Sequence, residues 1–79
     1  MEFTMVAGVL IKTNPNKTKS VYEQIKSLEG VANITAVFGR FDIVVMIRAL
    51  DIEAAGKMIS KIRSVNGVLS TETLIATSL

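Results

Sequence analysis

An internal repeat is the sequence feature that most constrains which fold this 79-residue chain can adopt. Residues 25–31 read IKSLEGV and residues 62–68 read IRSVNGV, so that four of the seven positions are identical. Upstream, VLIK at 9–12 matches VMIR at 45–48. The two matches follow in the same order, at offsets of 37 residues (25 to 62) and 36 residues (9 to 45). The sequence therefore indicates two copies of one structural unit.

Each unit is predicted to form a strand, a helix and a second strand. Asn14-Pro15-Asn16 and Asp51 are typical helix starts, because Asn and Asp cap free N–H groups and Pro fits the first turn. Gly30 and Gly67 are typical helix ends, since glycine adopts positive φ without a steric penalty. The helices between them carry apolar residues at helical spacing. We expect the four strands at about 4–13, 33–38, 43–49 and 69–77.

The resulting order is βαββαβ, which is the ferredoxin-like arrangement of the α+β class. Right-handed crossovers place both helices on one face of a four-stranded antiparallel sheet. The length allows one domain, residues 1–79, and a domain this short buries only about 60% of its unfolded surface. Its core alone is therefore marginal, and oligomerisation is an expected source of further stability.

The two central strands are apolar on both faces. Ile43, Val45 and Ile47 point one way in the third strand, whereas Val44 and Met46 point the other way. The first strand has the same pattern, because residues 5–11 read MVAGVLI and every residue on either face is apolar or glycine. Such strands are usually covered on both sides, but the chain's own helices cover only one. We therefore predict that a second chain packs on the open face.

Composition excludes several classes of site. The chain has no cysteine and no histidine, so it offers neither a disulfide nor a Cys/His zinc site, and we expect no cofactor. It has no cluster of acids with a reason for shifted pKa values, and we expect no catalysis. The net charge of +2 comes from dispersed residues, which is a weak basis for binding nucleic acid. No segment is typical of a signal peptide or membrane span, and we expect a cytoplasmic protein.

Two motifs at a defined spacing point to a family. VFGRFD precedes the third strand and STET begins the fourth. In these segments, and from about Val6 to Ala76, the chain closely resembles the effector (RAM) domain of the Lrp/AsnC, or feast/famine, transcriptional regulators. The resemblance implies dimers built by packing the sheets, further assembly into octameric or decameric rings, and small amino acids bound where dimers meet. Family members usually carry an N-terminal helix-turn-helix domain. This sequence starts on the first strand, so we expect a stand-alone effector module that does not bind DNA itself and acts alone or with full-length regulators.

The resemblance directs attention to the turn before the third strand. Gly39 lets backbone N–H groups approach an anion, and Arg40 can add a charge-assisted bond to a carboxylate. Phe41 can wall a side-chain pocket or serve as a core aromatic. Asp42 can accept from an ammonium group, but acids in turns commonly bond backbone N–H groups, and we favour that structural role. These four residues are candidate effector-binding residues.

Thr71 and Thr73 complete the candidate effector site. They share one face of the fourth strand and carry hydroxyls that donate or accept hydrogen bonds. Threonine is also a common strand residue, so the resemblance alone raises them to a site hypothesis. Glu72 points to the opposite face, where we expect it at a rim or in solvent.

Three other classes share this strand order. An RNA-recognition domain stacks bases on aromatic residues of its open face, but the third strand here reads IVVMI. An ACT-like amino-acid-binding module remains an alternative, with its ligand near the end of the first strand and the first helix. An enzyme of the dimeric ferredoxin-like barrel type is a more distant alternative. A Gly39→Val substitution separates the Lrp/AsnC-like site from an ACT-like one, since only the former loses binding.

Overall fold

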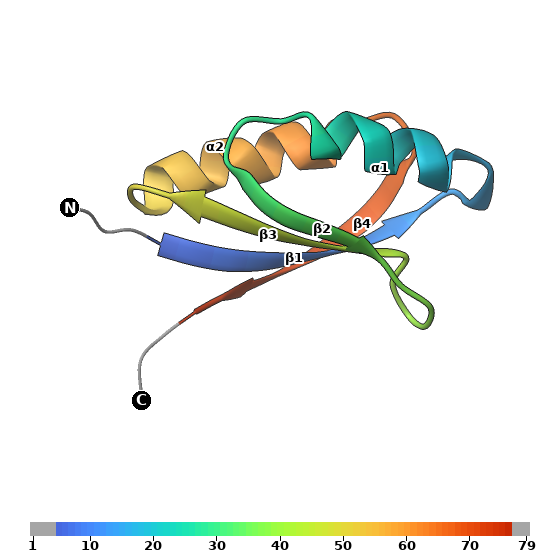
Figure 1. The fold of residues 1–79 in the computed structure, drawn as a ribbon, viewed down its shortest axis with the longest axis horizontal. Helices are drawn as coiled ribbons and strands as arrows, with labels where there is room; N and C mark the ends of the chain where they lie inside the picture. The colour runs from blue at the N-terminus through green and yellow to red at the C-terminus, as the bar shows by residue number, and fades with distance from the viewer. Residues whose placement is uncertain (1–4, 77–79) are drawn as a thin grey trace.

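The computed structural model describes residues 5–76 and has the predicted βαββαβ order (Figure 1). The elements are β1 (Met5–Thr13), a short 3₁₀ turn η1 (Pro15–Lys17), α1 (Thr18–Lys26), β2 (Val31–Ala36), β3 (Ile43–Ala49), α2 (Ile52–Arg63) and β4 (Val68–Ile75). The strands form one antiparallel sheet in the order β2-β3-β1-β4. Both helices lie over the same face of this sheet (Figure 1). The ferredoxin-like prediction is confirmed.

The helix ends show why the two halves repeat each other. After α1, the N–H of Val31 donates to the carbonyl of Leu28, and after α2 the N–H of Val68 donates to the carbonyl of Val65. The glycine before each valine has positive φ, +95° at Gly30 and +108° at Gly67. A Cβ at Gly67 would also lie 2.8 Å from the Cγ2 of Val21 in α1. The repeated Gly-Val therefore builds the same turn from helix to strand twice.

The helix starts follow the predicted capping residues. The side-chain oxygen of Asn14 accepts a hydrogen bond of 3.0 Å from the N–H of Asn16. The carboxylate of Asp51 accepts one of 2.8 Å from the N–H of Ala54 in the first turn of α2. Each bond satisfies a donor that a helix terminus leaves without a partner.

The core lies between the sheet and the two helices. It is aliphatic, because the chain has few aromatic residues and none of those described is fully buried. Its members are buried apolar residues of β1, β3, α1 and α2, namely Ala7, Val9, Ile11, Ile43, Val45, Ile47, Val21, Ile25 and Ile62.

The second strand differs from its predicted range of 33–38. Val31 already pairs with Ile47 directly after the helix-ending glycine. The register of pairing with β3 shifts between Val31 and Asn33, where β2 contains one extra residue. The strand ends at Ala36, and the side chain of Phe38 is fully exposed in the following loop. The apolar residues of VFGRF suggested a longer strand, but the loop is closed earlier by a bond from the Val37 N–H to the Asp42 carbonyl. The predicted outer ends at Thr4 and Thr77 lie outside the described residues.

Neither α1 nor α2 lies over the other side of the sheet (Figure 1). We call it the open face, and its apolar members are residues of β1, β3 and β4 that alternate with the core residues: Val6, Gly8, Leu10, Val44, Met46 and Leu74. Met46 is 36% exposed and Leu74 is 54% exposed. A Cβ at Gly8 would lie 3.5 Å from the Sδ of Met46, so glycine leaves space for this side chain on the sheet. The predicted alternation of the two central strands is confirmed.

Candidate functional site

The turn between β2 and β3 carries four of the six predicted site residues, Gly39 to Asp42. It extends past the end of the sheet, on the side away from the helices (Figure 1). Gly39 has φ +128°, and apart from residues 38–40 no atom of the described residues lies within 4 Å of the position that its Cβ would occupy. Arg40 is exposed and Phe41 is half-buried. The backbone at Gly39 is thus accessible, and its conformation favours glycine.

Asp42 ties this turn to the end of β1. Its Oδ2 accepts a hydrogen bond of 2.8 Å from the N–H of Thr13 and one of 3.1 Å from the Thr13 hydroxyl. The Thr13 hydroxyl also lies 2.6 Å from the hydroxyl of Thr18 in α1. Since the single proton of Thr13 points to Asp42, Thr18 is the donor to Thr13. The backbone N–H of Asp42 donates to the carbonyl of Ile11 at 2.8 Å. Asp42 therefore has the structural role that we favoured, although its side-chain partner belongs to β1 and not to its own turn.

These bonds favour the charged form of Asp42. The backbone N–H of Thr13 lowers the pKa of the carboxyl group below its usual value. Partial burial raises this pKa by less, and the Thr13 hydroxyl and the charge of Lys12 lower it further. Hydrogen bonds to a carboxylate stabilise its ionised form, so Asp42 is an anion at neutral pH.

We expect Asp42→Ala to lower the free energy of unfolding by about 1 kcal/mol at pH 7, because hydrogen bonds that join β1 to the turn are lost. The pKa of Asp42 is lowered in the folded state, so its charge stabilises the fold above the unfolded pKa of about 3.9 and ceases to do so as the pH falls through the folded value. Urea unfolding of both proteins at several pH values measures this. The difference between them should shrink below about pH 4; a difference that stays constant down to about pH 2 would contradict the assignment.

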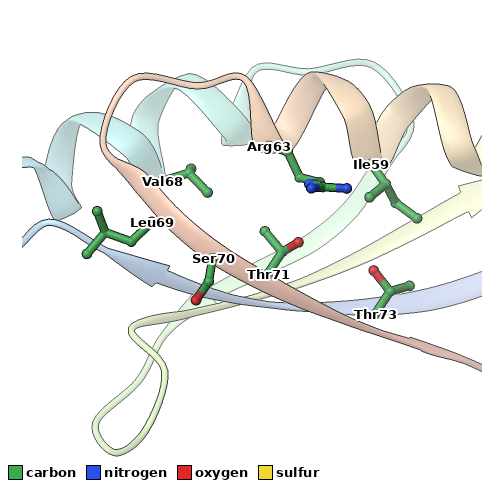
Figure 2. A pocket seen from close by; sticks show the side chains of 7 residues that line it. All are labelled: Ile59, Arg63, Val68, Leu69, Ser70, Thr71 and Thr73. Carbon is green, nitrogen blue, oxygen red and sulfur yellow. The ribbon is translucent and has the colours of Figure 1, made fainter.

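Thr71 and Thr73 line a pocket between α2 and β4 (Figure 2). They pair with Ile11 and Val9 of β1 and therefore face the helices, whereas Glu72 pairs with Leu10 on the open face and is exposed. The predicted alternation along this strand is confirmed. We call the hollow the α2–β4 pocket; its volume is about 470 Å³, and its lining consists of residues from these two elements: Ile59, Arg63, Val68, Leu69, Ser70, Thr71 and Thr73.

Sequence reasoning did not include the other lining residues of this pocket. Ile59 and Arg63 are four residues apart and therefore lie on the same side of α2. Ile59 is one of the apolar residues whose helical spacing predicts this helix, and its spacing from Arg63 was the one available signal for Arg63. Val68, Leu69 and Ser70 enter the lining because β4 begins beside the end of α2.

One chain does not bring all six predicted residues into a single pocket. The turn ends where β3 begins, and β1 lies between β3 and β4 in the sheet. The two groups are thus separated by two strand spacings, about 10 Å. They also face different sides, since the turn extends away from the helices and the threonines point toward α2 (Figure 2).

Two further observations concern the described part of the chain. Between residues 5 and 76, no group of three or more His, Cys, Asp or Glu side chains is arranged to hold a metal ion. Neither α1 nor α2, the two α-helices of this segment, has the length and apolar character required to cross a membrane.

Comparison with known proteins gives consistent matches over nearly the whole chain. Residues 6–79 match the model of the Lrp/AsnC ligand binding domain. The HTH-type transcriptional regulator LysM of Sulfurisphaera tokodaii is 36% identical over 76 residues, which cover 95% of this chain and 54% of the regulator. A second curated relative, a Pyrococcus furiosus transcriptional regulator of the HTH type, is covered to 49%. The chain thus spans about half the length of the curated relatives it matches.

Solved structures agree with these sequence matches. The crystal structure of the Thermus thermophilus protein TTHA0845 superposes with a TM-score of 0.89 at 34% identity, and the match covers 95% of both chains. The feast or famine regulatory protein Rv3291c from M. tuberculosis, solved in complex with L-methionine, has a TM-score of 0.81 at 21% identity. That match covers 95% of this chain and 51% of Rv3291c, and at this identity it supports the fold alone.

Proposed function

Because the chain belongs to the Lrp/AsnC ligand-binding domain family, we propose that it is a non-catalytic effector domain that binds a small amino acid and assembles through its sheet. The relatives are named as transcriptional regulators, which supports a regulatory role and a cytoplasmic location. Residues 1–79 form one domain in this proposal, and the binding of the regulated DNA lies outside this domain. The even distribution of a net charge of +2 favours this division of roles.

The two candidate regions have the chemistry that an amino acid requires. The backbone at Gly39 can donate to a carboxylate, and Arg40 and Phe41 are close enough in sequence to contact the same ligand. Asp42 holds this turn in place through Thr13. Thr71 and Thr73 supply hydroxyls in a pocket of a size typical for small ligands. Rv3291c, which shares the fold, is solved in complex with L-methionine, and we propose the same class of ligand for this chain.

The open face supports the proposed assembly. It carries neighbouring apolar side chains that neither α1 nor α2 covers, and patches of this kind generally mark interaction surfaces. Two chains packed through it form a dimer, and further contacts between dimers give octamers or decamers. Since β1 separates the turn from the two threonines in one chain, a site that uses both takes the turn from one chain and the threonines from another.

Calorimetry of the protein against the twenty amino acids tests the proposal, and we expect heat for at least one of them. Gly39→Val should lower its affinity at least about tenfold, because φ is +128° at this position and a β-branched residue strains the turn. Gly56→Ala is the control, since Gly56 lies in α2 with open space around it. An ACT-like site would keep its affinity after Gly39→Val, and heat from none of the amino acids would refute the proposal.

A further inference from the structure

The α2–β4 pocket has a one-sided charge. Among the described residues that line it, Arg63 carries a positive charge and none carries a negative charge. A second, smaller hollow is lined by Arg63 together with Ser60 and Ser64, and these two serines are neutral as well. Any charged ligand in the pocket is therefore under the influence of a cation that no lining side chain neutralises.

The position of Arg63 makes this charge available to a ligand. Arg63 is the last residue of α2, and Figure 2 shows its side chain extending along the helix above Thr71. The aliphatic part of the side chain lies on the same side of the helix as Ile59, and the guanidinium group faces the space over β4 (Figure 2). Beneath it are two hydroxyls, those of Thr71 and Thr73, whereas the hydroxyl of Ser70 points away from α2 (Figure 2).

These groups suit a carboxylate and give little to an ammonium group. A guanidinium can bind both oxygens of a carboxylate through parallel hydrogen bonds, and neighbouring hydroxyls can donate to the same oxygens. An ammonium group finds neutral hydroxyls as acceptors and is repelled by Arg63. In a zwitterionic amino acid, Arg63 therefore attracts the carboxylate and repels the ammonium group. A second carboxylate adds a further attraction and favours binding.

We infer that the α2–β4 pocket selects ligands of net negative charge, so that acidic amino acids bind in preference to neutral and basic ones, and that Arg63 sets this preference. The inference rests on the proposed function and names the ligand class of that site. Arg63 is a specificity residue in this view, because its guanidinium contacts the second carboxylate of the ligand.

Titration calorimetry with L-glutamate, L-glutamine and L-lysine tests the inference. Glutamate and glutamine have almost the same shape and differ in charge. We expect the wild-type protein to bind glutamate at least about tenfold more tightly than glutamine, and to bind lysine least, in line with the strength of charge-assisted hydrogen bonds. Aspartate, tested beside glutamate, shows which length of acidic side chain fits the pocket.

Variants show whether Arg63 causes the preference. Arg63→Gln should reduce the glutamate-to-glutamine affinity ratio to about one. Arg63→Lys should restore part of this ratio, because lysine returns the charge without the bidentate hydrogen bonding of a guanidinium. Lys61→Gln removes the same charge from the same turn of α2 but from a residue that does not line the pocket, so the ratio should be unchanged. Thermal unfolding of each variant confirms that it is folded.

The outcomes separate this inference from the proposed function. Equal affinity for glutamate and glutamine, or a ratio that Arg63→Gln leaves unchanged, overturns the role of Arg63 while amino-acid binding stands. Binding of a neutral amino acid without any binding of glutamate or aspartate would also overturn the role of Arg63 and leave amino-acid binding in place. If no amino acid binds, both the proposed function and the inference are overturned.

Discussion

Val44→Glu is expected to leave the chain folded and to reduce its assembly to single chains. Val44 lies on the open face between Leu10 and Thr35, and it is only partly buried in the isolated chain, so a glutamate there can reach water. In a two-fold interface every substitution is present twice. Burying an unpaired neutral polar group costs about 2 kcal/mol and burying a carboxylate costs more. Two carboxylates therefore cost at least about 4 kcal/mol, which corresponds to at least about a thousandfold increase in the dissociation constant.

Sedimentation equilibrium at micromolar concentration measures this effect. Leu50→Glu is the matched control, because Leu50 is also apolar and exposed but lies between β3 and α2 and not on the open face. The control should keep the mass of the wild-type assembly. A wild-type mass equal to one chain, or an assembly that Val44→Glu does not change, would show that the open face is not the contact surface.

Ile62→Ala is expected to destabilise the fold by about 2–5 kcal/mol, the usual cost of emptying a core position. Ile62 is fully buried in the small aliphatic core, where it belongs to the same cluster as Ile25 and Ile11. The stability of a small domain is about 5–15 kcal/mol, and a chain of 79 residues is expected near the lower end of this range. The variant should therefore lose a large part of its stability.

Ile52→Ala provides the same change on the same helix at an exposed position. The side chain of Ile52 is 66% exposed, and alanine is the better helix former, so we expect a loss below about 1 kcal/mol. Urea unfolding at one fixed protein concentration compares the two variants, since assembly makes the apparent stability depend on concentration. Equal losses at the two positions would contradict the assignment of the core.

The sequence was sufficient for the order of elements because its signals are local. The capping residues Asn14 and Asp51, the helix-ending glycines and the helical spacing of apolar residues each act within a few positions of the chain. The predicted range of β2 was wrong by two residues at both ends for the opposite reason. The strand begins where Val31 meets Ile47 and stops where Asp42 closes the loop, and both partners come from later in the chain.

The candidate site was predictable only in part. Composition and strand alternation were enough to show that Thr71 and Thr73 share a face, but not which face is covered by α2. The partner of Asp42 is Thr13, 29 residues earlier, and no local pattern indicates such a bond. Arg63 was missed because a charged residue at the end of a helix is usually in solvent, and its place in the lining depends on how α2 and β4 lie against each other.

The sheet order also determines when this chain can finish folding during synthesis. β1 is bonded on its two sides to β3 and to β4, so that each of its neighbours is made later than β1 itself. A nascent chain that has emerged through β3 still has one side of β1 without hydrogen-bond partners, and strand edges of this kind are prone to pairing with other chains. Resistance of ribosome-bound chains to a protease should therefore rise only after the residues of β4 have left the exit tunnel.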